Sequence, residues 1–499
     1  MHRQIAVLLA AGFVSSSAQA ASTPIRHLVV IFQENVSFDH YFATYPKAAN
    51  PPGEPRFVAR RGTPTVSGLG GALLDLNPNQ VNPFRLGRAR AATCDQDHDY
   101  GDEQKAMHGG LMDLFAQTVG TGPGTDGTLT CQATDVMGYF DGNTVTAMWN
   151  YAQRFALSDN SFGTTFGPSS PGAINLISGQ THGATPADRP GDTVAGTLIG
   201  DPRPFNDDCS PKGGFQPNQV VMSGKNVGDL LNARGVTWGW FQGGFAPTAR
   251  TAAGKAVCGA VHTGSNGKPK GDYLPHHAPF QYYASTANPH HLAPPNVAAI
   301  GSTDQANHQY DLTDFWSALD AGQLPAVSFL KARAFEDGHA GYSDPLAEQR
   351  FVVDAINRLQ ERPEWRETAV IIAYDDSDGW YDHVMPPIVS QSNTADDQLL
   401  GPGSCGTAPA GAAQGRCGYG PRLPLLAISP WARENFVDHS TTDQSSVLRF
   451  IEDNWELGRI GDDSFDARAG SLDNLFDFSR PRPGRLMLDP RTGLQLDEE

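Results

Sequence analysis

The fold is decided by the stretch His27-Leu-Val-Val-Ile-Phe-Gln-Glu-Asn-Val-Ser-Phe-Asp-His40. Its first six residues form a nearly continuous apolar run, which is typical of a strand buried on both faces of a sheet. The run ends in the polar residues Glu34 and Asn35. Because ligands of open α/β sheets bind beyond the carboxyl ends of the strands, these two residues are candidates for a functional site.

Apolar runs of the same kind recur along the chain, with helical patterns between them. Residues 345–361 place apolar side chains on one face, behind Asp344 and Pro345 as a helix start. This alternation predicts an α/β fold, with a mostly parallel central sheet and helices on both faces. The other predicted strands are 236–241, 326–330, 369–374 and 423–428, and the other predicted helices are 143–155 and 445–457.

The N-terminal residues indicate where the protein is located, and the remaining residues are expected to form one domain. Residues 1–20 combine a positive start, the apolar run Ile5–Val14 and an Ala-x-Ala pattern, which predicts a signal peptide cleaved after Ala20. We therefore expect a periplasmic or extracellular protein without stable membrane insertion, because no other stretch reaches membrane-spanning length. Residues 21–499 are predicted to form one domain, in which about 180–310 is a loop-rich insertion contributing to the active site.

The composition restricts the partners. With 54 acidic against 36 basic residues and a net charge of −18, the chain repels nucleic acid and anionic lipid in bulk. A small anionic substrate then needs local positive charge, for which a metal ion is the simplest source. Six cysteines in an exported chain predict disulfides, although their number leaves the pairing open. Cys405 and Cys417 are the favoured pair, because they lie in one Gly/Ala-rich loop.

A second predicted strand runs into an acidic cluster, at Tyr374-Asp375-Asp376. The three carboxylates of Glu34, Asp375 and Asp376, with the Asn35 amide oxygen, are hard oxygen ligands for a divalent cation. Each cluster alone is also typical of a helix N-cap or a solvated turn. The metal hypothesis depends on both strand ends facing the same crevice.

A serine turn and several histidines complete the candidate site. In Phe166-Gly-Pro-Ser-Ser-Pro-Gly172, flanking prolines and glycines predict a rigid turn whose hydroxyl could act as a nucleophile if a metal lowers its pKa. The alternative is a loop that caps the following helix. The alternative for the histidines is that they are exposed loop residues. The residues alone do not show which adjacent pair, His276–His277 or His290–His291, belongs to the site. The candidate histidines are His98, His276, His277, His290, His291 and His339.

Four motifs, in this order along most of the chain, resemble one known family. They are Glu34-Asn-x-Ser-Phe-Asp-His-Tyr-Phe42, Gly167-Pro-Ser-x-Pro-Gly172, His276-His-x-Pro-Phe-Gln-Tyr-Tyr283 and Asp375-Asp-x-x-Gly-Trp-Tyr-Asp-His383. Together they resemble the bacterial phosphoesterase family, which includes acid phosphatase A and phosphatidylcholine-type phospholipases C and belongs with alkaline phosphatase-like enzymes.

The resemblance implies a role for each matching residue. One divalent metal ion, which the ligand types leave open among calcium, magnesium, manganese, iron and zinc, would be held by Glu34, Asn35, Ser169, Asp375 and Asp376. Ser169 would be the nucleophile and would form a phosphoserine intermediate. The phosphoryl oxygens would be bound, or the leaving group protonated, by His98, His276, His277 and His339. Asp378 and His383 of the last motif would be supporting residues.

Ser169 and Gly172 favour the acid phosphatase branch, and therefore a phosphomonoesterase acting on small phosphate esters. The alternative is a phospholipase C that cleaves phosphocholine-type diesters of lipid headgroups. An aromatic cage for choline would favour this alternative, and its candidates are Trp238, Trp240, Tyr282 and Tyr283. A more remote alternative is a non-catalytic phosphate-binding protein on the same fold, which the intact set of site residues disfavours. Imidazoles as phosphate partners predict an acidic optimum.

Overall fold

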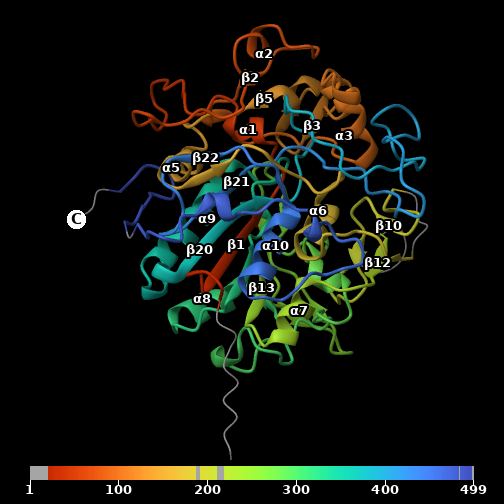
Figure 1. The fold of residues 1–499 in the computed structure, drawn as a ribbon, viewed down its shortest axis with the longest axis vertical. Coiled ribbons are helices and arrows are strands. Elements are labelled where there is room, and N and C mark those ends of the chain that lie inside the picture. Colours follow the sequence, from red (N-terminus) through yellow and green to blue (C-terminus); the bar gives the residue numbers. More distant parts are fainter. Residues whose placement is uncertain (1–20, 187–190, 211–217, 483, 497–499) are drawn as a thin grey trace, which may run out of the picture.

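The computed structural model describes residues 21–186, 191–210, 218–482 and 484–496. An eight-stranded sheet in the order β18-β13-β19-β1-β20-β21-β6-β22 forms its centre (Figure 1). The strands are β1 (His27–Gln33), β6 (Ala156–Ser158), β13 (Trp238–Gln242), β18 (Gln309–Asp311), β19 (Val327–Lys331), β20 (Thr368–Tyr374), β21 (Leu425–Ile428) and β22 (Phe436–Asp438). The predicted signal peptide, 1–20, lies outside the described residues.

The sheet is mostly parallel, as predicted. Strands β18, β13, β19, β1 and β20 pair in parallel, whereas β21 runs antiparallel to both β20 and β6. The five strands predicted from apolar runs are β1, β13, β19, β20 and β21. The predicted fold class is therefore confirmed, with β21 making the sheet mixed.

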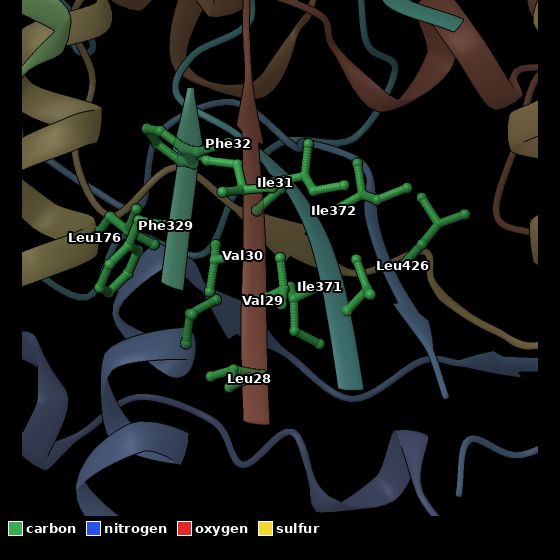
Figure 2. Close-up of a cluster of buried hydrophobic side chains, with 14 of the residues drawn as sticks. Leu28, Val29, Val30, Ile31, Phe32, Leu176, Phe329, Ile371, Ile372 and Leu426 are labelled. Carbon is green, nitrogen blue, oxygen red and sulfur yellow. The ribbon is translucent and has the colours of Figure 1, made fainter. Parts of the chain in front are cut away.

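Burial explains why β1 is apolar from Leu28 to Phe32. Successive side chains of a strand point to opposite faces, yet every residue from Leu28 to Phe32 is 0% exposed. Figure 2 shows these side chains packed between Phe329 of β19, Ile371 and Ile372 of β20, and Leu176 of a helix. Both faces of the sheet are therefore covered at β1.

The helices surround this sheet. The predicted start at Asp344 is confirmed, because its side chain accepts hydrogen bonds of 2.8 Å from the backbone N–H groups of Leu346 and Ala347. The longer helices are α3 (Tyr100–Met107), α5 (Thr146–Arg154), α6 (Ser169–Ser178), α7 (Val227–Arg234), α8 (Leu312–Asp320), α9 (Pro345–Gln360) and α10 (Gln444–Asn454). The short ones are α1 (Phe38–Phe42), α2 (Ala72–Asp75) and α4 (Phe115–Thr118).

Short strand pairs fill the connections. They are β2 (Phe84–Arg85) with β5 (Gly138–Tyr139), β3 (Gly124–Asp126) with β4 (Leu129–Cys131), β7 (Ser161–Phe162) with β23 (Thr442–Asp443), β9 (Thr193–Val194) with β10 (Thr197–Leu198), β14 (Ala249–Arg250) with β15 (Ala256–Val257), and β16 (Val261–Thr263) with β17 (Pro269–Gly271). A three-stranded set consists of β8 (Ala184–Thr185), β11 (Arg203–Pro204) and β12 (Gln219–Met222). Most of them lie in 180–310, a region that also supplies β13 to the central sheet.

All six cysteines are paired, as Cys94–Cys131, Cys209–Cys258 and Cys405–Cys417. The prediction of disulfides is confirmed, including the favoured pair in the Gly/Ala-rich loop. Within the described part of the chain, no helix has the length and apolar character needed to cross a membrane.

Candidate active site

The two acidic strand ends lie side by side. Strands β1 and β20 are parallel neighbours in which Gln33 lies opposite Tyr374, so the residues that follow them leave the same edge of the sheet. The backbone N–H of Asp375 donates to the Gln33 carbonyl oxygen over 3.2 Å, and that of Asn35 reaches an Asp375 carboxylate oxygen over 3.5 Å. The convergence that the metal hypothesis requires is present.

Ser169 is the first residue of α6 and faces the carboxylates. Its hydroxyl lies 3.3 Å from Glu34 Oε2 and 3.2 Å from Asp376 Oδ2, and the residue is 1% exposed. The N-cap position belongs to Pro168, so the Ser169 side chain does not cap the helix. Because the N-terminus of a helix stabilises negative charge, a phosphate at Ser169 would gain from α6.

A glycine allows this close approach. A Cβ atom at Gly172 would overlap the carbonyl oxygen of Asp375, where β20 ends. The first turn of α6 therefore rests directly on the backbone of the acidic strand end. The glycine of the predicted turn is required by packing between α6 and β20.

The residues present fit a divalent cation. The Asn35 Oδ1 atom is buried without a hydrogen-bond partner, and Asn35 follows Glu34 directly, with its backbone N–H directed at an Asp375 carboxylate oxygen. Burial raises the pKa of Asp376 to about 7 and that of Asp375 well above its usual value, since their negative charges are poorly compensated. A bound cation would relieve this cost and give the unpartnered Asn35 oxygen a partner.

Glu34 Oε1, by contrast, is already engaged. It lies 2.9 Å from His277 Nδ1 and forms an ion pair with the buried ammonium of Lys331, which is also 3.6 Å from Asp375. Lys331 ends β19, the strand on the other side of β1. Sequence reasoning missed it, because the pairing of β19 with β1 is known only from the structure.

The other candidate histidines lie around the same edge. His98 Nε2 is 3.4 Å from the Asn35 side-chain nitrogen, and its Nδ1 bonds the Gln96 carbonyl oxygen at 2.9 Å. The ring of His339 lies 6.0 Å from that of His98, and the ring of His276 lies 4.1 Å from that of His277.

Their protonation differs. Burial opposes protonation of His98, but the carboxylates of Asp376 and Asp378 outweigh it and hold its pKa well above the usual value. Asp378 Oδ1 lies 3.4 Å from His98 Nδ1, and neither of its buried carboxylate oxygens has a hydrogen-bond partner. His98 is therefore the cationic imidazole of the group.

At the other three histidines, His276, His277 and His339, the effect of burial on the pKa is not outweighed. It lowers the pKa of His277 to about 4, that of His276 well below its usual value, and that of His339 in the same direction. These rings are neutral at neutral pH, so only His98 keeps the cationic character on which the expected acidic optimum relied.

Some candidates lie elsewhere. His290 and His291 contact Asp208 and Asp207, at 2.9 and 3.0 Å, beside the Cys209–Cys258 disulfide. His383 bonds Asp39 at 2.6 Å in an ion-pair network. The four aromatic residues considered for a choline cage are all buried in the core, with at most 1% exposure: Trp238, Trp240, Tyr282 and Tyr283.

The fold and the site define a class: an α/β protein with a serine hydroxyl held among carboxylates at the ends of two parallel strands. The phosphoesterase family model matches residues 25–458, and the chain belongs to this family. The resemblance seen in the motifs is thereby confirmed.

Named relatives are phospholipases C. The non-hemolytic phospholipase C of Burkholderia pseudomallei is 26% identical over 481 residues, covering 92% of this chain and 59% of that protein. Phospholipase C B of Mycobacterium tuberculosis is 25% identical over 490 residues, covering 94% of this chain and 80% of that protein. The chain thus spans about three fifths of the Burkholderia protein.

Solved structures show distant likeness. Murine ectonucleotide pyrophosphatase/phosphodiesterase 5 aligns with a TM-score of 0.35 and 9% identity, over 67% of this chain and 95% of that one. A protein in the alkaline phosphatase superfamily from Vibrio parahaemolyticus aligns with a TM-score of 0.28 and 11% identity, over 79% and 75%.

Proposed function

We propose that this chain is a metal-dependent phosphoric-ester hydrolase of the phospholipase C type, with Ser169 as nucleophile. The observation that carries the proposal is the Ser169 hydroxyl, 3.3 Å from Glu34 and 3.2 Å from Asp376, at the N-terminus of α6. The names of the relatives favour a diester substrate over the monoester predicted from the Ser169–Gly172 turn.

A divalent metal ion would be held by Glu34, Asn35, Asp375, Asp376 and Ser169, and it would supply Lewis-acid charge neutralisation. The site residues prepare Ser169 for attack on phosphorus. The hydroxyl proton leaves toward the carboxylates, the new O–P bond forms in line with the leaving oxygen, and the α6 N-terminus stabilises the phosphoserine. Water then hydrolyses this ester.

The histidines have separate tasks in this proposal. His98, cationic and held by Asp378, binds a phosphoryl oxygen and can protonate the leaving alcohol. His277 donates through Nδ1 to Glu34, and its buried Nε2 has no partner, so it orients the ligand rather than carrying charge. His276 and His339, both neutral, complete the wall of the site.

A phosphomonoesterase is the second candidate. Because Trp238, Trp240, Tyr282 and Tyr283 are packed in the core, none of these residues forms an aromatic cage for a choline group. This observation argues against specificity for choline esters. The substrate is then a phosphate monoester or a diester with a different headgroup.

Export is part of the proposal. The signal-like sequence of residues 1–20 and three disulfides support a periplasmic or extracellular location, where thiols are oxidised.

The substrate class is tested with two chromogenic esters that carry no choline group, p-nitrophenyl phosphate and bis(p-nitrophenyl) phosphate. We expect p-nitrophenol release from the diester, abolished by EDTA and restored by one divalent metal. Preference for the monoester would establish the second candidate, and hydrolysis unaffected by chelation would contradict the metal-dependent proposal.

A further inference from the structure

Two basic side chains near the candidate active site form no ion pair. Arg203 and Lys270 contact no acidic side chain at ion-pairing distance within the described ranges, and the Arg203 Nε atom is buried without a hydrogen-bond partner. The chain has 54 acidic against 36 basic residues, so carboxylate partners are abundant. Cations that nevertheless lack a carboxylate partner indicate a binding site for another anion.

Arg203 is fixed next to the serine turn by its own strand. Asp201, two residues earlier, accepts a hydrogen bond of 2.8 Å from the backbone N–H of Ser170. The intervening Pro202 carbonyl oxygen accepts the hydroxyl of Tyr282, which itself lies 3.2 Å from the Ser170 hydroxyl. Arg203 therefore follows two residues that are connected to Ser170, the neighbour of Ser169: Asp201 through its side chain and Pro202 through Tyr282.

Lys270 is fixed from the opposite part of the insertion. Its ammonium lies 3.5 Å from the centroid of the Tyr342 ring, and this ring stacks on His339 at 4.2 Å. The β16–β17 hairpin that carries Lys270 is tied to the same place, because Ser265 donates to the carbonyl oxygens of Tyr342 and Ser343 over 3.0 and 2.7 Å. The cation is thus held on an aromatic face beside a site histidine.

Both cations act on one histidine. After burial and His277, the positive charges of Arg203 and Lys270 contribute to the low pKa of His276. The carboxylates of Asp337, Asp95 and Glu34 act on Lys270 electrostatically, although Lys270 forms no ion pair within the described ranges. The two basic residues therefore act electrostatically on His276 from two separate elements, β11 and β17.

We propose that Arg203 and Lys270 form an anion-binding subsite beside Ser169. This subsite selects phosphate esters whose headgroup, bonded to the reacting phosphate, carries a second anionic group. The inference rests on the proposed function, in which Ser169 attacks such an ester. A guanidinium and an ammonium favour a carboxylate or a further phosphate there. They disfavour a headgroup whose only additional charge is positive.

The test uses lipids that differ by one carboxylate. Dihexanoyl phosphatidylserine and dihexanoyl phosphatidylethanolamine are water-soluble and release the same dihexanoylglycerol. We expect wild type to prefer the serine ester in kcat/KM, and Arg203→Met or Lys270→Met to lower that preference by about tenfold each, the effect of one charge-assisted hydrogen bond. Arg203→Lys and Lys270→Arg should retain most of it.

Lys268→Met is the matched control, because Lys268 lies on the same hairpin but pairs with Asp126 at 3.7 Å. This variant should keep the wild-type preference. If the Arg203 and Lys270 variants lost kcat/KM equally on both lipids, the inference would be overturned. The cations would then bind the reacting phosphate or only stabilise the fold.

A binding measurement separates this inference from the proposed function. Titration calorimetry of Ser169→Ala compares O-phosphoserine with phosphoethanolamine, which lacks only the carboxylate. Tighter binding of phosphoserine, lost with Lys270→Met or Arg203→Met, supports the subsite even if wild type hydrolyses neither lipid. Equal affinities for the two ligands would contradict it, whatever the activity.

Discussion

Gly172 lies where the turn that carries Ser169 packs against the acidic end of β20. A substitution of this single residue therefore tests the packing. Alanine in a helix interior is normally better than glycine by about 1 kcal/mol. Here the added methyl group overlaps the Asp375 carbonyl oxygen, so Gly172→Ala should instead destabilise the protein and separate Ser169 from Asp376. Thermal unfolding and metal affinity measure the two effects.

Gly122→Ala is the matched control, because an added Cβ there meets no atom within 4 Å. A Gly172→Ala variant as stable as the Gly122→Ala variant, with unchanged metal affinity, would contradict the packing account.

Local signals indicated the acids after the buried strands and the proline-flanked serine turn, and the family resemblance grouped Ser169 of that turn with Glu34, Asn35, Asp375 and Asp376. The basic partners escaped it. Lys331, Arg203 and Lys270 act through positions on β19, β11 and β17, whose neighbours are fixed only by tertiary folding. The charge balance at a site therefore depends on contacts that local patterns do not encode.

At the scale of an element, α1 carries a buried histidine that resists protonation. His40 stacks on Trp380 at 3.9 Å, and its Nδ1 bonds the Gly138 carbonyl oxygen at 2.8 Å. Burial lowers its pKa from 6.5 to about 3. Its contribution to stability is thus complete above pH 6.5 and is lost as the pH falls toward 3, because the unfolded state binds the proton.

We expect His40→Gln to be less stable than wild type at pH 7 and to lose less stability on acidification. The difference in unfolding free energy between the two proteins should shrink by up to about 1.4 kcal/mol per pH unit below 6.5. Denaturant unfolding at pH 7, 6 and 5 measures it, with exposed His290→Gln as control. A difference that stays constant with pH would refute the account.

The comparison with the variant is needed because other groups titrate in the same range. Glu348, buried between the hydroxyls of Tyr41 and Tyr374 at 2.6 Å each, has its pKa raised by burial to about 7. Its contribution has the opposite sign and is lost as the pH rises. Only the difference between proteins isolates His40.

The longer elements were predictable and the short ones were not. Strands β1 and β20, with seven residues each, are buried on both faces and therefore read as apolar runs. Strands β6, β18 and β22 have three residues each, too few to show a period. Their places in the sheet depend on pairing with longer neighbours.

For the whole molecule, the metal site predicts a link between cation binding and stability. At the junction of β1, β20 and α6, burial raises the pKa of Asp375 and Asp376, and the Asn35 side-chain oxygen has no hydrogen-bond partner. Chelated protein should therefore be less stable than metal-loaded protein. At one hundred times the dissociation constant, a bound ion adds about 2.7 kcal/mol to the unfolding free energy. Thermal melts of EDTA-treated wild type, with and without each divalent metal, measure this effect.

Asp376→Asn should lose most of the metal-dependent increase, whereas Asp453→Asn, on exposed α10 surface, should keep it. A melting temperature of wild type that does not respond to any divalent metal would contradict the assignment of the cation site.

The central claim is that Ser169 attacks phosphorus. It is tested most directly by quenching the enzyme with acid during turnover of a phosphate ester and locating covalent phosphate by peptide mass spectrometry. We predict phosphate on Ser169 in wild type and none in Ser169→Ala, whose hydrolysis should fall by at least about a thousandfold. Phosphate on Ser170, or a Ser169→Ala variant with wild-type activity, would contradict the account.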